Sequence, residues 1–347
     1  MAGRISCLCK GVTQEVVLGP LSGRSILDLC HCTTCRAVSG QLCSSYYPLQ
    51  SRPPNLESLG EYQESPCISR YFCKTCGAHV FARQKQTEQY FVAAGLWEEN
   101  PPPFQLIRHW QAKDTRDRGL SAFFPVDPGA TSPGCYLYAD THCQQGREDE
   151  RKIEEWTEDD RRLPAGCHCG GIEFYVTSSD PGSNDASSPW PDLLVPYHSG
   201  SPENPADVKW WLRDEGKKYL AGTCACRSCR LASGFPIQTW AFIPKSNLQN
   251  ADGTALSFGL GTMRQYESSP GIYREFCGRC GATVFWHCEE RPLLIDVSVG
   301  LLRAKSGARA EDWVEWHLGR VSFSGMAVDP KLIHQLEAGL KIWEANR

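Results

Sequence analysis

Seven cysteines recur twice along this chain in the same order, as C-x-C, then C-x-C-x-x-C, then C-x-x-C-G. The first set is Cys7, Cys9, Cys30, Cys32, Cys35, Cys73 and Cys76, and the second is Cys167, Cys169, Cys224, Cys226, Cys229, Cys277 and Cys280. Together they account for 14 of the 19 cysteines. Thiolates at such short spacings are typical zinc ligands.

Seven thiolates fill one tetrahedral zinc site with four ligands and leave three ligands for a second. The C-x-C and C-x-x-C-G pairs form the four-ligand set, because a glycine after C-x-x-C permits the tight turn of a zinc knuckle. A closed zinc of this kind stabilises a fold, whereas a zinc with an open position does chemistry. The pattern therefore predicts up to four Zn²⁺ per chain, one structural and one catalytic in each repeat.

The C-x-C-x-x-C segments supply three thiolates each and predict an open zinc. Such a zinc would lower the pKa of an incoming thiol, and the thiolate could attack a small carbonyl electrophile. The alternative is a closed structural site completed by His31, His79, His109 or a distant carboxylate. The second repeat has Ala225 and Thr283 in place of His31 and His79, so neither histidine is a ligand common to both repeats.

Arg36 and Arg230 directly follow the third thiolate of each triplet. They either compensate the negative charge of the thiolates or bind a substrate carboxylate. Five cysteines have no ligand spacing and are interpreted as buried or incidental thiols: residues 43, 67, 135, 143 and 288.

The repeat extends beyond the cysteines, which indicates duplication of a whole domain. Residues 62–81 and 266–285 are identical at 12 of 20 positions, and the segments from Cys30 and Cys224 share 6 of 11. We predict a first zinc domain at 1–146, a charged linker at 147–162 and a second zinc domain at 163–347.

The second repeat carries a long insertion. Its C-x-C lies 55 residues before the triplet, against 21 in the first repeat. A Pro- and Ser-rich stretch at about 177–208 indicates a loop. The following VKWWLRDEGKKYL is rich in aromatic residues and is expected to pack on the domain.

Elsewhere the chain shows brief β-branched and aromatic runs, such as QTWAFIP and LLIDVSV, bounded by turn residues. Each repeat is therefore expected to be mainly β, built of small antiparallel sheets around zinc. Leu332, Leu336, Leu340 and Trp343 recur at helical spacing and predict an amphipathic C-terminal helix.

The composition limits the classes of binding partner and indicates the cellular compartment. The net charge of −4 comes without any basic tail, which argues against nucleic acid and anionic membranes. The N-terminus lacks an apolar signal region and no long apolar run is present, so we expect a cytoplasmic protein, with a nuclear location left open. In that compartment clustered cysteines are metal ligands more often than disulfides.

These motifs resemble those of the GFA/CENP-V family, named for glutathione-dependent formaldehyde-activating enzyme and centromere protein V. The resemblance is carried by SCLCKGV, CHCTTCRAVSG and YFCKTCGAHVF in the first half, and by GCHCGGIEF, CACRSCRLASG and REFCGRCGATVF in the second. It covers both halves, and the tandem arrangement is similar to that of filamentous fungal members.

The resemblance implies a zinc-bound β-tent fold and carbon–sulfur lyase chemistry, with formaldehyde and glutathione condensing to S-hydroxymethylglutathione. It also implies structural zinc at the C-x-C and C-x-x-C cysteines of each half and catalytic zinc at Cys30, Cys32, Cys35 and at Cys224, Cys226, Cys229. Lys10 stands where the family motif has glycine, which predicts an altered turn.

Two functions follow. The first is a zinc-dependent lyase acting on an adduct of glutathione or another small thiol. The alternative is a non-catalytic zinc scaffold or binding protein. Retention of both triplets favours the enzyme, because a scaffold needs only the four-cysteine sites.

Overall fold

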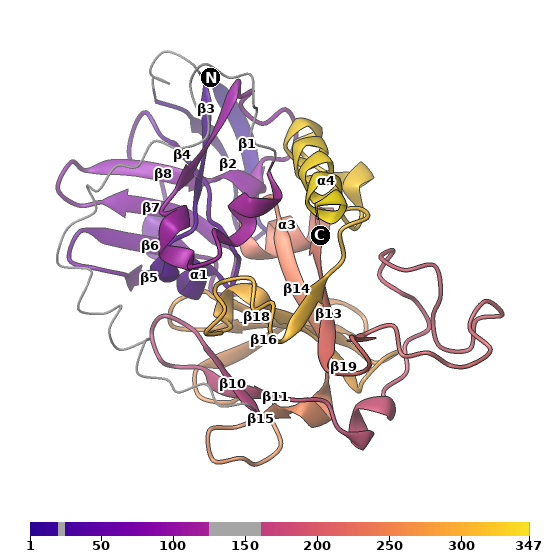
Figure 1. The fold of residues 1–347 in the computed structure, drawn as a ribbon. Coiled ribbons are helices and arrows are strands. Elements are labelled where there is room, and N and C mark those ends of the chain that lie inside the picture. The colour runs from indigo at the N-terminus through magenta and orange to yellow at the C-terminus, as the bar shows by residue number, and fades with distance from the viewer. Residues whose placement is uncertain (20–24, 125–160, 347) are drawn as a thin grey trace.

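The computed structural model describes residues 1–19, 25–124 and 161–346 (Figure 1). As predicted, the chain is mainly β. Its described residues contain three α-helices, α1 (Thr33–Ser39), α3 (Arg227–Ser233) and α4 (Pro330–Ala345). The predicted linker at 147–162, except its last two residues, lies outside the described residues, as do Cys135 and Cys143.

The strands of the first half form three small sheets. A hairpin pairs β1 (Ala2–Ser6) with β2 (Thr13–Val17), and β3 (Ile26–Cys30) runs parallel to β9 (Leu106–Trp110). A five-stranded antiparallel sheet has the order β4 (Tyr46–Pro48), β8 (Gln89–Ala93), β7 (His79–Gln84), β6 (Ile68–Phe72) and β5 (Gly60–Gln63).

The second half repeats this topology with one larger sheet. Its first sheet contains β10 (Arg162–Gly166), β11 (Glu173–Thr177) and β15 (Leu248–Gln249). The second has the order β12 (Leu212–Arg213), β13 (Lys218–Cys224), β14 (Gln238–Pro244), β19 (Leu294–Ser298), β18 (Thr283–Cys288), β17 (Ile272–Cys277) and β16 (Met263–Ser269), with β20 (Val314–Trp316) parallel to β13. Its direct β13–β14 pairing joins what in the first half are two separate sheets.

The sequence explains which strands lie inside. The apolar run of β14 is buried along its whole length, as expected for a strand covered on both faces. The edge strand β16 is largely polar and mostly exposed, which suits a strand with one unpaired side.

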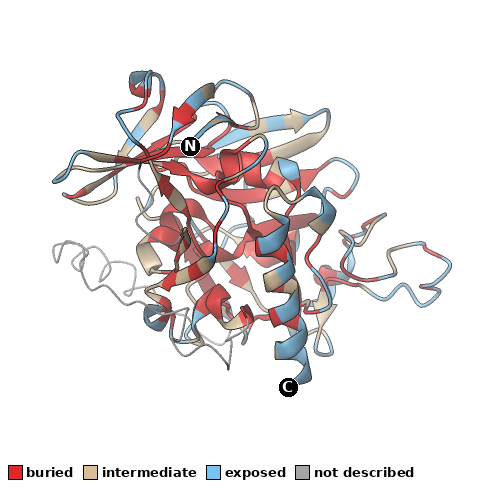
Figure 2. Cartoon of the chain, turned by 90° about the horizontal axis from the view of Figure 1, so that it is seen from above, coloured by how far each residue is buried: buried red, intermediate tan, exposed pale blue. Residues whose placement is uncertain are grey.

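The two halves share one hydrophobic core. A single cluster of buried side chains runs from Ile5 and Trp97 in the first half to Phe285 and Leu340 in the second. Figure 2 shows the buried residues gathered in the middle of the molecule, between the sheets. The two repeats of the sequence therefore share one core in the folded chain.

An approximate two-fold relation connects the halves through matched backbone hydrogen bonds. The N–H of Leu8 donates to the carbonyl of Leu231 at 3.0 Å, and the N–H of His168 donates to that of Ala37 at 3.1 Å. Leu8 and His168 are the middle residues of the two C-x-C motifs, while Ala37 and Leu231 lie on the helices that follow the triplets. Each C-x-C turn thus supports the triplet helix of the other half.

The glycines that end the two triplet helices lie at the centre of this contact. Gly40 and Gly234 have φ of +79° and +91°, which a side chain disfavours. A Cβ on Gly40 would overlap the carbonyl oxygen of Thr283, and one on Gly234 would overlap that of His79. This close approach explains why glycine follows serine at this point in both repeats.

Helix α4 confirms the predicted C-terminal helix and adds a further link. Asp329 caps it by accepting the N–H of Leu332 at 3.1 Å, and Pro330 occupies its first turn. It buries Leu332, Leu336 and Leu340, and its Gly339 lies against the backbone of Phe123 in the first half. Among the described residues, no helix has the length and apolar character needed to cross a membrane.

Candidate active site

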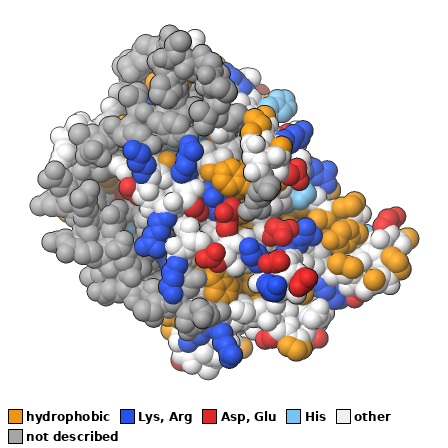
Figure 3. Space-filling view, viewed as in Figure 1, with side chains coloured by type: hydrophobic (Ala, Val, Ile, Leu, Met, Phe, Trp, Pro, Cys, Tyr) orange, Lys and Arg blue, Asp and Glu red, His pale blue; other side chains and the backbone are white. Residues whose placement is uncertain are grey.

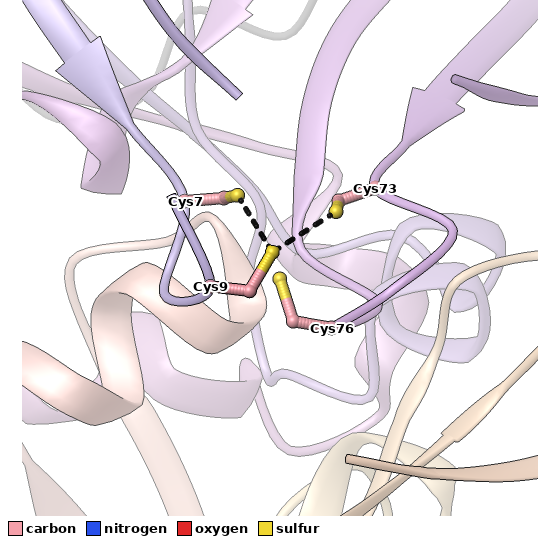
Figure 4. A group of neighbouring side chains, drawn as sticks. All are labelled: Cys7, Cys9, Cys73 and Cys76. Atoms are coloured by element: carbon pink, nitrogen blue, oxygen red, sulfur yellow. Dashed lines mark hydrogen bonds between the residues drawn. The ribbon is translucent and has the colours of Figure 1, made fainter. Parts of the chain in front are cut away.

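The structure brings the predicted four-cysteine sets together at two places. The first contains Cys7, Cys9, Cys73 and Cys76 (Figure 4), and the second contains Cys167, Cys169, Cys277 and Cys280. All sulfurs of a set lie within 4.8 Å of one another, and the sulfurs of Cys9 and Cys73 are 3.5 Å apart. We refer to these sets as the first-half and second-half clamps.

Backbone amides point at the clamp sulfurs. The N–H groups of Val12 and Gly11 donate to Cys7 and Cys9 at 3.3 and 3.4 Å, and that of Arg279 donates to Cys277 at 3.4 Å. Such bonds favour thiolates over thiols. Sulfurs at a tetrahedral zinc, with Zn–S of about 2.3 Å, would be about 3.8 Å apart, so the donor set fits zinc.

The turn at Lys10 is not altered, contrary to the expectation from the sequence. Lys10 has φ +61° and its counterpart Gly170 has φ +67°. Lysine thus adopts the left-handed conformation that glycine takes in the second half, at a cost of about 1–2 kcal/mol.

The predicted triplets also assemble. Cys30, Cys32 and Cys35 form one cluster and Cys224, Cys226 and Cys229 another, each with sulfurs within 4.8 Å. In each, the middle cysteine caps a short helix, since the sulfurs of Cys32 and Cys226 accept the N–H of the third cysteine at 3.3 Å. One strand end and one helical turn therefore set the three ligands.

The thiols of a triplet perturb one another strongly. Hydrogen bonds with Cys32 and Cys35 raise the pKa of Cys30 well above its ordinary value. In the second half, hydrogen bonds with Cys226 and Cys229 raise the pKa of Cys224. Hydrogen bonds with Cys224 and Cys229 lower the pKa of Cys226 to about 2. A set of buried thiols that holds fewer protons than sulfurs is a natural cation site.

No histidine or carboxylate joins either triplet within the described part of the chain. The Nε2 of His31 instead lies 2.8 Å from Nδ1 of His109, and Nε2 of His79 lies 2.8 Å from the carbonyl oxygen of Val38. Burial lowers the pKa of His109 to about 3 and that of His79 to about 4, so both rings are neutral. These histidines form hydrogen bonds elsewhere, so each triplet offers three candidate ligands among the described residues.

Arg36 and Arg230 are both buried and bond to the protein. The Nε of Arg36 donates to the carbonyl of His31 at 3.2 Å. Arg230 donates to the carbonyls of Gly95 and Trp97, in the other half, at 2.6 and 2.8 Å. Burial lowers the pKa of Arg230 to about 10. Their predicted role in substrate binding stays a prediction.

The arginines that contact the triplets are Arg70 and Arg274, which sequence analysis missed. A guanidinium nitrogen of Arg70 lies 3.4 Å from the sulfur of Cys35, and two of Arg274 lie 3.8 Å from that of Cys229. The signal was available, because these arginines occupy the same position in the aligned segments 62–81 and 266–285.

A cavity of about 590 Å³ lies beside the second-half triplet. All three triplet cysteines and Arg274 line it, together with Trp240 on β14. Arg274 is buried, with only 4% of its surface exposed, and its Nε has no hydrogen-bond partner within the described part of the chain. Neither Arg36 nor Arg230 is among the described residues that line the cavity.

The insertion of the second half forms part of this cavity. Trp190, Asp192, Leu193 and Leu194 come from the loop predicted at about 177–208 and line one side of it. On the face shown in Figure 3, hydrophobic side chains gather at the right edge, where Figure 1 places this loop. The aromatic tail packs as expected through its two tryptophans, since Trp210 and Trp211 are 0% exposed.

Two of the remaining cysteines are buried free thiols, as expected: Cys43 and Cys288. Cys288 also lines the cavity. The interpretation of Cys67 as an incidental thiol was wrong, because this cysteine forms a disulfide bond.

Comparison with known proteins gives two matches. The family described as "Glutathione-dependent formaldehyde-activating enzyme" matches residues 3–111 and again residues 209–316. A protein of Podospora anserina, provisionally named a glutathione-dependent formaldehyde-activating enzyme, is 31% identical over 105 residues. That match covers 28% of this chain and 48% of the relative, so the chain spans about half the length of the relative it matches.

Proposed function

The chain belongs to the glutathione-dependent formaldehyde-activating enzyme family, and from this premise we propose that its second half is a zinc-dependent lyase of carbon–sulfur bonds. Its substrate would be an adduct of an aldehyde with glutathione or a similar thiol. The observation that carries the proposal is the cavity, which joins the triplet thiols to a buried arginine without a carboxylate partner among the described residues.

Cys224, Cys226 and Cys229 would hold the zinc ion, which when bound supplies a Lewis acid that lowers the pKa of a thiol. Arg274 supports an anionic substrate there in two ways. Its guanidinium lies against the sulfur of Cys229, next to the would-be ligands, and it lines the cavity, where it could donate charge-assisted hydrogen bonds to a carboxylate of glutathione.

The reaction adds the thiol S–H across an aldehyde C=O. A sulfur–carbon bond forms, the carbonyl π bond breaks, and the proton of the thiol ends on the carbonyl oxygen. The proton carrier we propose is Asp192, which lines the cavity. Burial raises the pKa of this carboxyl group, which favours its protonated form. It shares the buried Arg291 with Asp296, the two carboxylates lying 3.3 and 2.6 Å from one guanidinium nitrogen.

The first half fits the alternative of a structural metal site better. There the charge of Arg70 is neutralised by Glu64 in an ion pair whose side chains are only 8% and 9% exposed. The guanidinium also lies over the ring of Tyr46, 4.9 Å from its centroid. An arginine paired in this way has little charge left for a substrate.

The test compares the two triplets in the full chain. Equilibrium exchange between formaldehyde with glutathione and their adduct is followed by NMR for the wild type, Cys226→Ser and Cys32→Ser. We expect Cys226→Ser to lose about 100-fold or more of the acceleration, as when an activating metal ligand is lost, and Cys32→Ser to stay within about threefold of the wild type. Zinc content and melting temperature of each variant separate a lost site from a lost fold.

Equal losses from both variants would assign the chemistry to both halves. A folded, zinc-loaded wild type that accelerates no aldehyde–thiol exchange would leave the scaffold as the function of the whole chain.

A further inference from the structure

Five aromatic side chains of the described residues line the second-half cavity, and each offers a flat apolar surface. They are Trp190, Trp240, Phe242, Trp286 and Phe323. The volume of about 590 Å³ lies within the roughly 300–1,000 Å³ of sites for drug-sized ligands. The one-carbon group that formaldehyde contributes to an adduct is too small to contact such a wall.

The wall is held in place from behind. The guanidinium of Arg291, whose side chain is 0% exposed, lies 4.7 Å from the ring centre of Trp286 and 5.7 Å from that of Trp190. One of its nitrogens lies 3.3 Å from a carboxyl oxygen of Asp192 and 2.6 Å from one of Asp296. Trp210, from the tail of the insertion, packs against Phe242 with ring centres 4.9 Å apart. Rings fixed in this way lose little freedom when a ligand binds.

Two of the rings keep an open face. Trp190 and Trp286 are only half-buried although both line the cavity. Trp240 is buried and lies beside the triplet in the small apolar cluster that contains Cys226 and Cys229. An aromatic group attached near the reacting sulfur would therefore meet rings on more than one side.

The first half carries different side chains at the positions that correspond to this wall. Tyr46 of β4 pairs with Ala93, the last residue of β8. Trp240 of β14 pairs with Ser298, the last residue of β19, so Tyr46 is the counterpart of Trp240. Pro48 stands in place of Phe242 by the same register. Ala82 replaces Trp286 in the aligned repeats. Trp190 belongs to the insertion, which the first half lacks.

We infer that the second half selects thiol adducts whose carbonyl-derived group is aromatic, or similarly broad and apolar. The inference rests on the proposed function, since the sulfur of the adduct is placed at Cys224, Cys226 and Cys229. The apolar group then lies against the tryptophans. The bonds made and broken are those of the proposed reaction, and no oxidant or reductant is needed.

The test uses two stable thioethers, S-benzylglutathione and S-methylglutathione, which differ by one phenyl ring and cannot react. Calorimetry on the zinc-loaded full chain gives both affinities. Burying a phenyl ring is worth about 1.5–3 kcal/mol, so the benzyl compound should bind about 10- to 100-fold more tightly. Trp286→Ala, which installs the residue of the first half, should reduce this ratio to about threefold or less.

Two controls separate the wall from the fold. Trp286→Phe keeps a flat ring and should retain most of the preference. Trp110→Ala removes a half-buried tryptophan of the first half and should leave the ratio unchanged. Equal affinities of the wild type for the two thioethers, or no binding of either, would overturn the inference.

Failure of this inference is distinct from failure of the proposed function. A chain that exchanges formaldehyde and glutathione but shows no benzyl preference retains the lyase proposal and loses this one. A chain that prefers the benzyl thioether but accelerates no aldehyde exchange has the binding site and lacks the chemistry.

Discussion

The two triplet sites of this chain share their ligands and differ in nearly everything around them. Both place three cysteines at a strand end and a helix start, with an arginine beside the third sulfur. In the first half that arginine, Arg70, is paired with Glu64. In the second half, Ser268 takes the place of Glu64, and Arg274 makes no ion pair among the described residues.

The apolar surroundings differ in the same direction. Ala82 and Pro48 of the first half are replaced by Trp286 and Phe242, and the insertion adds Trp190 to the wall. The difference teaches that a set of metal ligands does not by itself make a reaction site. In the second half, the cavity next to the sulfurs and an arginine without an ion pair among the described residues support the proposed chemistry.

The largest expected effect is the loss of stability when a four-cysteine site is broken. It also tests whether the two halves unfold together. We expect Cys73→Ser or Cys277→Ser to cost ~5 kcal/mol or more, because binding of a structural zinc is coupled to folding. A loss of this size is comparable with the whole stability of a domain. Since the halves share a core and support each other's triplet helices, both should unfold in one transition for either variant. Calorimetric melting with parallel zinc analysis measures this.

Cys43→Ala is the matched control, since it removes a buried free thiol outside the four cysteine clusters. Its cost should be about 1 kcal/mol, in the range of ordinary point substitutions. Two separate melting transitions in Cys73→Ser, with the second half still zinc-loaded, would show that the repeats fold independently.

A smaller change should make the second site electrostatically like the first. Ser268→Glu introduces the counterpart of Glu64, and the new carboxylate is expected to pair with Arg274. Loss of one charged hydrogen bond to a glutathione carboxylate is worth about 1.5–3 kcal/mol. The affinity for S-benzylglutathione, measured by calorimetry, should therefore fall about tenfold or more.

Ser269→Glu adds the same charge at the next, exposed position of β16 and serves as the control. It should leave the affinity within about twofold, because the side chain of Ser269 is exposed and a charge there is screened by solvent. If the affinity falls similarly in both variants, the cause is long-range repulsion, and the proposed bond between Arg274 and the carboxylate of the ligand would be contradicted.

Much of the site could be predicted from spacing alone. The cysteine pattern indicated the members of all four clusters, since short C-x-C and C-x-x-C segments leave little choice of geometry. The mainly β fold and helix α4 followed from local periodicity and turn residues. These features depend on residues close together in sequence.

What the sequence analysis missed depends on contacts between distant segments. The mutual support of the halves rests on bonds such as that from Leu8 to Leu231, for which no local pattern exists. The insertion was expected to be a loop, and its composition hid Trp190 and Asp192 as cavity residues. Arg274 was accessible in principle, because alignment of the repeats places it with Arg70.

The smallest effect that sharpens the comparison concerns His79, whose counterpart is Thr283. Burial lowers the pKa of His79 to about 4, below its ordinary value of 6.5. Between these values the unfolded chain binds a proton and the folded chain does not, so stability falls as the pH drops from 6.5 to 4. The full difference is about 3 kcal/mol, at about 1.4 kcal/mol for each pH unit.

His79→Thr should flatten this part of the stability profile, measured by urea unfolding between pH 5 and 7, above the range in which His79 itself becomes protonated. The variant should be less stable at pH 7, because it loses the bond to the carbonyl of Val38, and the gap to the wild type should narrow by about 2 kcal/mol at pH 5.

His334→Thr removes an exposed histidine of α4 and should preserve the wild-type slope. Zinc content measured at each pH separates proton uptake from metal release, since His79→Thr leaves every thiolate in place. If His79→Thr keeps its zinc and its unfolding free energy depends on pH as in the wild type, His79 is protonated in the folded chain. The assignment of a neutral ring bonded to the carbonyl of Val38 would then be wrong.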